Sequence, residues 1–216
     1  MRTASVPATV DDDPTGWFER LYVRAEMGEA IVPWARDEPN PLLVEWTRAR
    51  GLAGAGRRAL VVGSGLGDDA EHLASLGFAT VAFDVAPTAI AGARARHPES
   101  AVDYQVADAL DPPAAWRGAF DLVVECITVQ SLPPSYHAAT AARIAGFVAP
   151  GGTLIVVTAA RDDDEEPDGP PWPLARAELD HFLAEGLALA RLEALEQPGG
   201  TPVVRRWRAE YRRGEA

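Results

Sequence analysis

Five short apolar runs, separated by segments of helical or turn character, constrain the fold of this chain more than any other feature. They cover residues 59–63, 80–84, 102–107, 121–127 and 153–159. Continuous apolar runs of this length are typical of parallel strands buried on both faces. We therefore expect an α/β fold whose parallel sheet is doubly wound, with helices on both faces.

The segments between these runs have the length and apolar spacing of connecting helices. Helices are expected over residues 68–76, 87–96 and 135–148, with a short turn at 114–116. The residues APGG at 149–152 predict the end of the third helix and a turn into the fifth strand.

The chain after the fifth run is expected to add two more strands. Residues 161–173 (RDDDEEPDGPPWP) are too acidic and proline-rich for regular structure, and a helix is predicted over residues 174–185. Strands over 187–196 and 203–213, joined by the turn QPGGTP, would form a C-terminal antiparallel hairpin and bring the sheet to about seven strands, mostly parallel. The last strand alternates between two sets of side chains, Val203, Trp207, Ala209 and Tyr211 on one face and Arg206, Arg208, Glu210 and Arg212 on the other.

The chain is expected to have three parts. Residues 1–14 are polar and include a run of three aspartates, which predicts a mobile N-terminal segment. Residues 15–57 predict a helical cap, with one helix that follows Thr15 and a second that Asn40 caps. Residues 58–216 would form the main domain.

Composition limits the class of protein. The 216 residues are 47% hydrophobic, enough for a full core, and the net charge of −12 argues against nucleic acid as a partner. No stretch approaches the roughly 18 apolar residues of a membrane span, and the first residues lack the apolar centre of a signal peptide. Cys126 is the single cysteine, so no cysteine-cluster metal site is expected. We expect a cytoplasmic protein, a monomer or homodimer, that acts on a small molecule.

The stretch VVGSGLGDDA, residues 61–70, predicts a ligand site. Gly63, Gly65 and Gly67 follow the first strand, and Asp84 ends the next one. A glycine-rich turn between a strand and a helix lets a ligand lie against the main chain, and the acid can accept hydrogen bonds from ribose hydroxyls. The turn alone fits either a dinucleotide or another adenosine-containing ligand.

The spacing of the glycines favours one of these ligands. Asp68 stands where a dinucleotide fingerprint has its third glycine, and Asp69 follows it. Two carboxylates at a helix start stabilise its dipole but repel a pyrophosphate docked there. A cationic ligand without phosphate, such as S-adenosylmethionine, is therefore favoured.

The segments ALVVGSGLGDDAEHLA, TVAFDVAPTAI, VADAL, FDLVVECITVQSLPP and VAPGGTLIVVT resemble, in their order and spacing, a class I S-adenosylmethionine-dependent methyltransferase over about residues 58–160. The resemblance implies a Rossmann-like sheet with strand order 3-2-1-4-5-7-6 and S-adenosyl-L-methionine as cofactor. It places the turn at Gly63 under the amino-acid part of the cofactor, Asp84 at the ribose, and Asp108 at the adenine. Residues 125–129 would form the floor of the site at the end of the fourth strand. The candidate cofactor-binding residues are Trp34, Gly63, Ser64, Gly65, Asp84, Val85, Ala107, Asp108, Ala109, Glu125 and Cys126.

One position departs from the family pattern. Many members have an acidic residue two places before the first glycine, whereas this chain has Val61. The methionyl amino group would then be held elsewhere, by the Gly63 carbonyl or by the carboxylate of Asp68 or Asp69.

A narrower set of features resembles the thiopurine and thiol methyltransferases and their bacterial relatives. These features are an N-terminal helical segment with tryptophans, the Pro33-Trp34 loop and GPPW at 169–172. The resemblance implies a small nucleophilic substrate, often one that reacts through sulfur.

Glu125 and His137 are the candidates for a general base. A carboxylate in the apolar run LVVECI is costly when buried and unpaired, so Glu125 either faces the site or has a partner. His137 begins a helix near the pocket, although a surface position is equally consistent with its sequence. Cys126 would point to the opposite face from Glu125 and pack in the core. Trp34 either closes over the cofactor or packs on the sheet edge.

Two features near the C-terminus have both a structural and a functional interpretation. Arg205 interrupts the apolar face of the last strand, and either binds a substrate anion or pairs with the acidic surface. Residues 162–166 form either a solvated loop or a mobile lid.

The sequence thus predicts a small-molecule methyltransferase, with a thiol or other sulfur nucleophile as acceptor. A thiol ionises near neutrality without a strong base, whereas an alcohol needs one. The alternatives are O- or N-methyl transfer to a small metabolite, an NAD-dependent oxidoreductase, and a binding module that holds the adenosyl ligand without catalysis.

Overall fold

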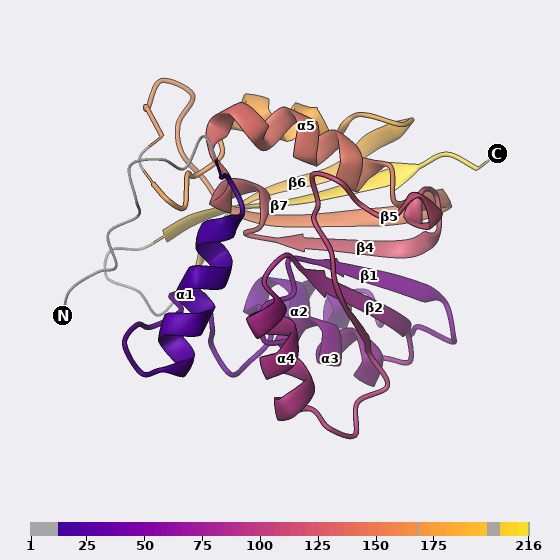
Figure 1. Ribbon diagram of the computed structural model, residues 1–216. Coiled ribbons are helices and arrows are strands. Elements are labelled where there is room, and N and C mark those ends of the chain that lie inside the picture. Colours follow the sequence, from indigo (N-terminus) through magenta and orange to yellow (C-terminus); the bar gives the residue numbers. More distant parts are fainter. Residues whose placement is uncertain (1–12, 168, 198–203, 216) are drawn as a thin grey trace.

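The computed structural model of the protein describes residues 13–167, 169–197 and 204–215. Its centre is one sheet with strand order β3-β2-β1-β4-β5-β7-β6 (Figure 1), which confirms the expected order. Strands β1 to β5 are parallel, whereas β7 runs antiparallel to both β5 and β6. The strands are β1 (Arg58–Val62), β2 (Ala79–Asp84), β3 (Asp103–Val106), β4 (Phe120–Cys126), β5 (Val148–Ala159), β6 (Leu187–Gln197) and β7 (Val204–Arg213).

Helices cover both faces of the sheet, as expected for a doubly wound fold. Helix α5 and the 3-10 helices η1 and η3 pack on one face, and α2, α3 and α4 pack on the other. Among these residues, no helix is both long and apolar enough to cross a membrane. The helices are α1 (Gly16–Glu26), α2 (Pro41–Ala49), α3 (Asp68–Ser75), α4 (Pro87–Arg96), η1 (Ala114–Trp116), η2 (Val129–Ser131), α5 (Pro134–Ala145) and η3 (Arg176–Phe182).

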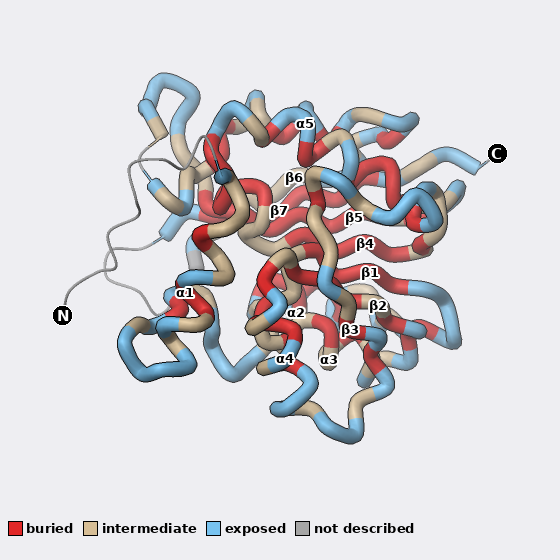
Figure 2. The backbone as a smooth tube through the Cα atoms, viewed as in Figure 1, coloured by how far each residue is buried: buried red, intermediate tan, exposed pale blue. Residues whose placement is uncertain are grey.

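The core explains why the strands are continuous apolar runs. In β1, Leu60 and Val62 enter the cluster under α5, whereas Ala59 and Val61 enter the cluster under α2 and α3. All four are buried, and Figure 2 shows buried residues concentrated along the central strands. Because successive side chains point to opposite faces, a strand covered on both sides must be apolar throughout.

The second helix of the cap forms for the predicted reason. The Asn40 side chain accepts a hydrogen bond from the Leu42 amide at 3.0 Å, which satisfies one free donor at the helix start. Pro41 occupies the first turn, where its missing amide costs nothing. Leu43 and Trp46 then bury one face of the helix against the sheet.

The predicted helix over residues 174–185 is wrong, because the structure contains only the 3-10 helix η3 there. The Tyr211 hydroxyl donates to the Leu179 carbonyl at 2.8 Å. That carbonyl would accept from Leu183 in an α-helix, but the Leu183 amide bonds to Asp180 instead. A contact with the last strand therefore prevents the α-helical turn.

The turn predicted at 149–152 is part of strand β5, which begins at Val148. The pairing of β4 with β5 shifts register between Phe120 and Leu122, so the glycine pair fits an irregularity within the sheet. The predicted mobile segment 1–14 and the QPGGTP turn lie largely outside the described residues.

Both faces of β7 are buried, including the one with charged side chains. Arg208 donates to the Leu42 carbonyl at 2.9 Å, and the Trp46 indole donates to Glu210 at 3.0 Å. Helix α2 thus covers this face, and the polar side chains there fasten it to the last strand.

Candidate functional site

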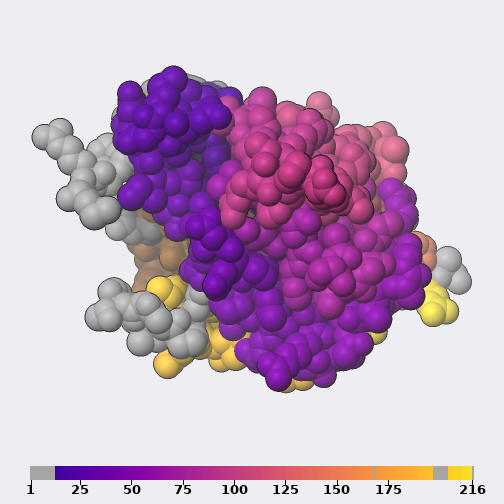
Figure 3. All heavy atoms as spheres, turned by 90° about the horizontal axis from the view of Figure 1, so that it is seen from below, coloured from indigo at the N-terminus to yellow at the C-terminus, as the bar shows by residue number. Residues whose placement is uncertain are grey.

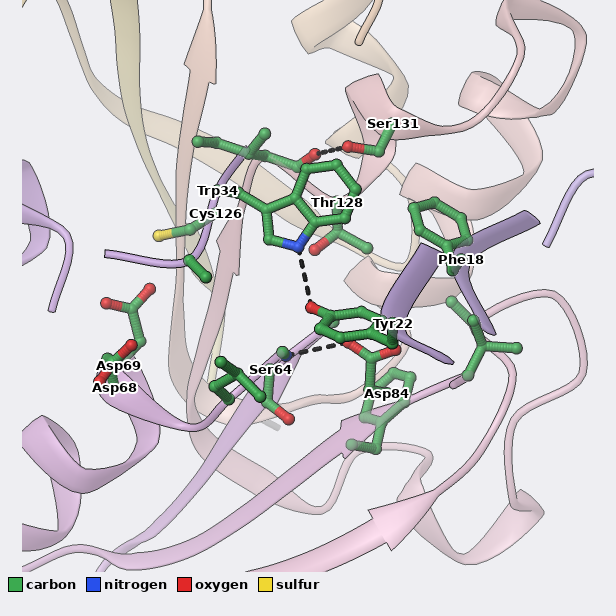
Figure 4. A pocket seen from close by; sticks show the side chains of 18 of the residues that line it. Phe18, Tyr22, Trp34, Ser64, Asp68, Asp69, Asp84, Cys126, Thr128 and Ser131 are labelled. Atoms are coloured by element: carbon green, nitrogen blue, oxygen red, sulfur yellow. Dashed lines mark hydrogen bonds between the residues drawn. The ribbon is translucent and has the colours of Figure 1, made fainter. Parts of the chain in front are cut away.

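A pocket lies at the carboxyl ends of the central strands, where doubly wound sheets bind their ligands. The loops after β1, β2, β3 and β4 line one side, and α1 with residues 34–40 lines the other. Including its open mouth, the space is about 1050 Å³. Figure 4 shows Tyr22 and Trp34 of the cap facing the strand end that carries Asp84.

Two glycines let the backbone approach its neighbours at the end of β1. Gly63 and Gly65 have φ angles of 61° and 53°, in the left-handed region that side chains disfavour. A Cβ on Gly63 would lie 2.4 Å from Thr128 Oγ1, and one on Gly65 would lie 2.9 Å from Tyr22 Oη. No side chain fits at either position.

Ser64, between these glycines, carries a free polar atom. Its hydroxyl is buried in the pocket wall, and no residue that the structure describes is hydrogen-bonded to it. Leaving a buried hydroxyl unpaired costs free energy. Ser64 Oγ is thus a polar atom in the pocket wall without a partner among the described residues.

Asp84 is held rigidly at the end of β2. One carboxylate oxygen accepts from the Gly65 amide at 2.9 Å and the other from the Ala86 amide at 2.9 Å. Burial raises the pKa of Asp84, and these amide bonds oppose the rise. Nearby, the Trp34 indole donates to the Tyr22 hydroxyl at 2.8 Å. Burial and the charge of Asp84 raise the pKa of Tyr22, so the phenol stays protonated at neutral pH.

The opposite end of the pocket is acidic. Asp68 and Asp69 line it at the start of α3, and Asp69 accepts from the Asn40 amide at 2.6 Å. Burial raises the pKa of Asp69, whereas hydrogen bonds from Asn40 and the Cys126 thiol lower it. Burial, and then the charge of Asp69, raise the pKa of Cys126 well above its ordinary value. Cys126 is therefore a neutral thiol that both lines the pocket and packs against the core.

The structure does not bring Glu125 into the pocket. Its side chain is fully buried, and Oε1 accepts from the amides of Thr128 at 2.6 Å and Val129 at 2.9 Å. Burial raises the pKa of Glu125 to about 7, although both amide bonds oppose the rise. Of the two interpretations of this acid, the partnered one agrees with the structure.

His137 also lies outside the pocket, and it is buried rather than on the surface. Its Nδ1 lies 2.9 Å from Glu178 Oε1 and its Nε2 lies 2.8 Å from the Leu132 carbonyl. Burial raises the pKa of Glu178, but hydrogen bonds from His137 and Ala175 outweigh it and lower the pKa to about 2. Both ring nitrogens are occupied, so this histidine is not positioned as a base.

The other candidates converge at the pocket, although their roles stay predictions. Asp108 lines it while also accepting from the Leu110 amide at 2.8 Å in its own turn. Arg205 forms an exposed ion pair with Asp162 at 2.7 Å, which favours the structural interpretation of that residue. The candidates at the pocket are Trp34, Gly63, Ser64, Gly65, Asp84, Val85, Ala107, Asp108, Ala109 and Cys126.

Several residues that line the pocket carry no sequence signal that would assign them to it. Phe18 and Tyr22 belong to the apolar stripe of α1, which gave no sign that part of it faces a ligand. Ser131 lies in a turn that has no sequence motif of its own. The lining residues not proposed as candidates include Thr15, Phe18, Tyr22, Arg36, Glu38, Asn40, Leu66, Ser131 and Leu132.

The central part of the chain is similar to a known domain family. Residues 59–152 match a family model described as "Methyltransferase domain". Over these residues the chain is similar to that domain, and its sheet order and glycine turn are those expected for the fold of class I S-adenosylmethionine-dependent methyltransferases.

The chain is 37% identical over 134 residues to the "Ubiquinone biosynthesis O-methyltransferase" of Xanthomonas axonopodis pv. citri (strain 306), covering 58% of this chain and 55% of that protein. The chain thus spans about half the length of the curated relatives it matches.

Two solved structures share the fold along most of the chain. One, described as "Conversion of a Disulfide Bond into a Thioacetal Group during Echinomycin Biosynthesis", has a TM-score of 0.73 at 25% identity and covers 91% of this chain and 93% of its own. The other is the Burkholderia thailandensis 1,6-didemethyltoxoflavin-N1-methyltransferase with bound S-adenosylhomocysteine. It has a TM-score of 0.67 at 15% identity and covers 99% of this chain and 94% of its own. These relatives do not support the narrower resemblance to thiopurine and thiol methyltransferases.

Proposed function

We propose that the protein transfers a methyl group from S-adenosylmethionine to a small molecule. The observation that carries this proposal is the buried, unpaired Ser64 hydroxyl, which lies in a glycine turn beside the fixed carboxylate of Asp84. A ligand that carries hydroxyls beside an amino-acid group could form hydrogen bonds with both the Asp84 carboxylate and the Ser64 hydroxyl. Such a ligand matches an adenosyl compound.

The residues present fit the cofactor along its length. Asp108 would lie at the adenine and Asp84 at the ribose. Asp68 and Asp69 would hold the methionyl ammonium in place of the acid that Val61 replaces. Arg36 lines the pocket, and among the described residues it has no ion-pair partner, so it suits the methionyl carboxylate.

A dinucleotide fits this pocket poorly. Asp68 and Asp69 stand where its pyrophosphate would bind, and Glu38 adds a third carboxylate to the lining. The negative charges of these carboxylates repel a phosphate, whereas they attract a positively charged sulfonium. The charge of the pocket thus supports a methyl donor over a hydride carrier.

When bound, S-adenosylmethionine supplies an electrophilic methyl group, so the protein's tasks are to align a nucleophile and to exclude water. Phe18 and Trp34 of the cap suit the second task. Of the residues described, no histidine lines the pocket, and Glu125 is occupied by backbone amides. A thiol, with a reference pKa of about 8.5, needs the least help from a base. We therefore propose a sulfur nucleophile as the acceptor.

Transfer to oxygen is the second candidate. The observation that favours it is the 37% identity to an O-methyltransferase. Against it, a phenol has a reference pKa of about 10 and would need a general base, and no described histidine lines the pocket. Formation of S-adenosylhomocysteine with matched panels of thiols and phenols would discriminate between these acceptors. Turnover with the phenols alone would contradict the sulfur proposal.

Thermal unfolding with and without ligands tests the cofactor, because a ligand that binds only the folded state raises its stability. S-adenosylmethionine and S-adenosylhomocysteine should raise the unfolding temperature, and NADH should not. A rise with NADH alone would overturn the proposal. Binding of both adenosyl compounds without turnover on any panel would instead indicate a non-catalytic binding module.

A further inference from the structure

The turn that follows β4 contains a strained residue in the pocket wall. Ile127 lines the pocket with a φ angle of 67°. A β-branched residue in the left-handed region is a genuine outlier, and such outliers persist only when the surroundings hold them. The neighbouring side chains of this turn therefore need to supply a constraint.

Glu125 supplies one constraint on this turn. Its Oε1 accepts from the amides of both Thr128 and Val129, directly after the strained residue. Bonds from amides to a carboxylate are about twice as strong as neutral ones. Two hydroxyls complete the restraint, because Ser131 donates to the Ile127 carbonyl at 2.7 Å and Thr128 donates to the Val62 carbonyl at 2.9 Å.

The same turn is anchored from the neighbouring strand. Gln130 Oε1 accepts from the Thr158 hydroxyl and from the Ala159 amide, each at 2.5 Å. The Gln130 carbonyl accepts from the Trp172 amide at 2.6 Å, which ties in the loop after β5. These bonds hold the far end of the turn. At Ile127 itself the amide donates to the Val157 carbonyl at 2.9 Å, and Glu125 holds the two amides that follow.

Packing alone does not explain why this position carries a carboxylate. Glu125 is fully buried, and no described residue is hydrogen-bonded to its Oε2. An apolar side chain of similar volume would avoid that desolvation cost. We therefore attribute the presence of a carboxylate at this position to the two hydrogen bonds that Oε1 accepts.

We propose that Glu125 is a positioning residue: it holds Ile127 in the left-handed conformation and so shapes the wall of Ile127, Thr128 and Ser131 along the ligand pocket. This proposal rests on the methyltransferase function for its ligand. Thr128 links this wall to the cofactor end, because it lies against Gly63. Displacement of the turn would therefore weaken cofactor binding.

A double-mutant cycle tests the coupling between Glu125 and the strain at Ile127. The four proteins are the wild type, E125L, I127G and E125L/I127G, with E125Q as a matched control that keeps an oxygen acceptor. Their affinities for S-adenosylhomocysteine are measured by calorimetry and their stabilities by thermal unfolding. Glycine removes the strain, so it makes the constraint unnecessary.

We expect E125L to bind about tenfold more weakly and E125Q to bind within about threefold of the wild type. The double variant should bind within about threefold of I127G, because the glycine backbone needs no restraint. Additive losses, or an equal loss in E125Q and E125L, would overturn the proposal. A side chain that only fills space would not be rescued by I127G.

Two outcomes separate this proposal from the proposed function. If the wild type does not bind S-adenosylhomocysteine, the methyltransferase function fails, and the coupling is judged from the unfolding temperatures of the same four proteins. If E125L does not fold, a folded double variant supports the proposal and an unfolded one contradicts it.

Discussion

Single residues in this pocket serve the backbone and the ligand together. Asp84 binds two main-chain amides, and its buried carboxylate is thereby fixed before any ligand arrives. Such preorganisation lowers the cost of binding, because no rotamer has to be ordered. Ser64 is held in place in a similar way, because it lies between two glycines at positions where a side chain would clash with its neighbours.

Replacing Asp84 with asparagine should weaken the binding of S-adenosylhomocysteine about tenfold, because a charge-assisted hydrogen bond contributes about 1.5–3 kcal/mol. Calorimetric titration would measure the loss. Asp111→Asn is the matched control. It makes the same chemical change at an exposed aspartate in the loop after β3, and this residue does not line the pocket. Equal affinities of the wild type and D84N would remove Asp84 from the ribose site.

Glu125 should make stability depend on pH. Burial raises its pKa in the folded protein to about 7, from 4.5 in the unfolded chain. The folded state therefore binds more protons between these values, and stability falls as pH rises through the window, by up to about 3 kcal/mol. Tyr211 and Cys126 are the titratable groups beside it, and both stay neutral there.

E125Q cannot titrate, so it isolates this contribution from other carboxylates such as Asp69 and Asp84. Urea unfolding of both proteins at about pH 5 and about pH 8 would measure it. The stability of E125Q relative to the wild type should increase toward the higher pH. A constant difference would show that Glu125 does not change its protonation over this range.

At the scale of elements, the cap depends on a contact between two helices. Helix α4 has no capping side chain of its own at Ala86. Instead Glu19 of α1 accepts from the Thr88 amide at 3.0 Å and from the Thr88 hydroxyl at 2.6 Å. Figure 3 shows the cap, in indigo and violet, against the magenta residues around α4. One carboxylate thus caps α4 and fastens α1 over the pocket.

Glu19→Ala should loosen the cap while leaving the sheet intact. Loss of these bonds would raise the dissociation rate of S-adenosylhomocysteine about tenfold and expose α1 to proteolysis, with a small change in global unfolding. Stopped-flow measurement of ligand release and limited trypsin digestion would measure both effects. Glu26→Ala, on the same helix but exposed, is the control. An unchanged release rate would mean that the cap does not retain the ligand.

An element could be predicted from the sequence when the residues that determine it lie within the element itself. The central strands and α2 carry their own signals, apolar runs and an Asn40-Pro41 cap, and were predicted from sequence. Helix η3 was not, because a hydroxyl on a strand about 30 residues away intercepts its carbonyl. The positions of Glu125 and His137 outside the pocket lining could not be predicted for a similar reason, since their partners follow from tertiary packing.

At the scale of the whole molecule, the net charge of −12 acts together with the acidic end of the pocket. Their summed field extends into solvent and attracts cations, and salt screens it over about 10 Å at 0.1 M. S-adenosylmethionine carries one net positive charge through its sulfonium, whereas S-adenosylhomocysteine has none. Apart from this charged methyl sulfonium the two ligands are the same, so the difference between their affinities reports how the field acts on the positive charge.

The affinity for S-adenosylmethionine should therefore fall several-fold as ionic strength rises from about 0.02 M to about 0.5 M, and that for S-adenosylhomocysteine should change little. Calorimetric titration of both ligands across this range would measure the two slopes. The D68N variant should flatten the S-adenosylmethionine slope, because it removes one carboxylate from the lining. Parallel slopes for the two ligands would mean that the sulfonium lies outside this field, and that the acidic end does not select the charged donor.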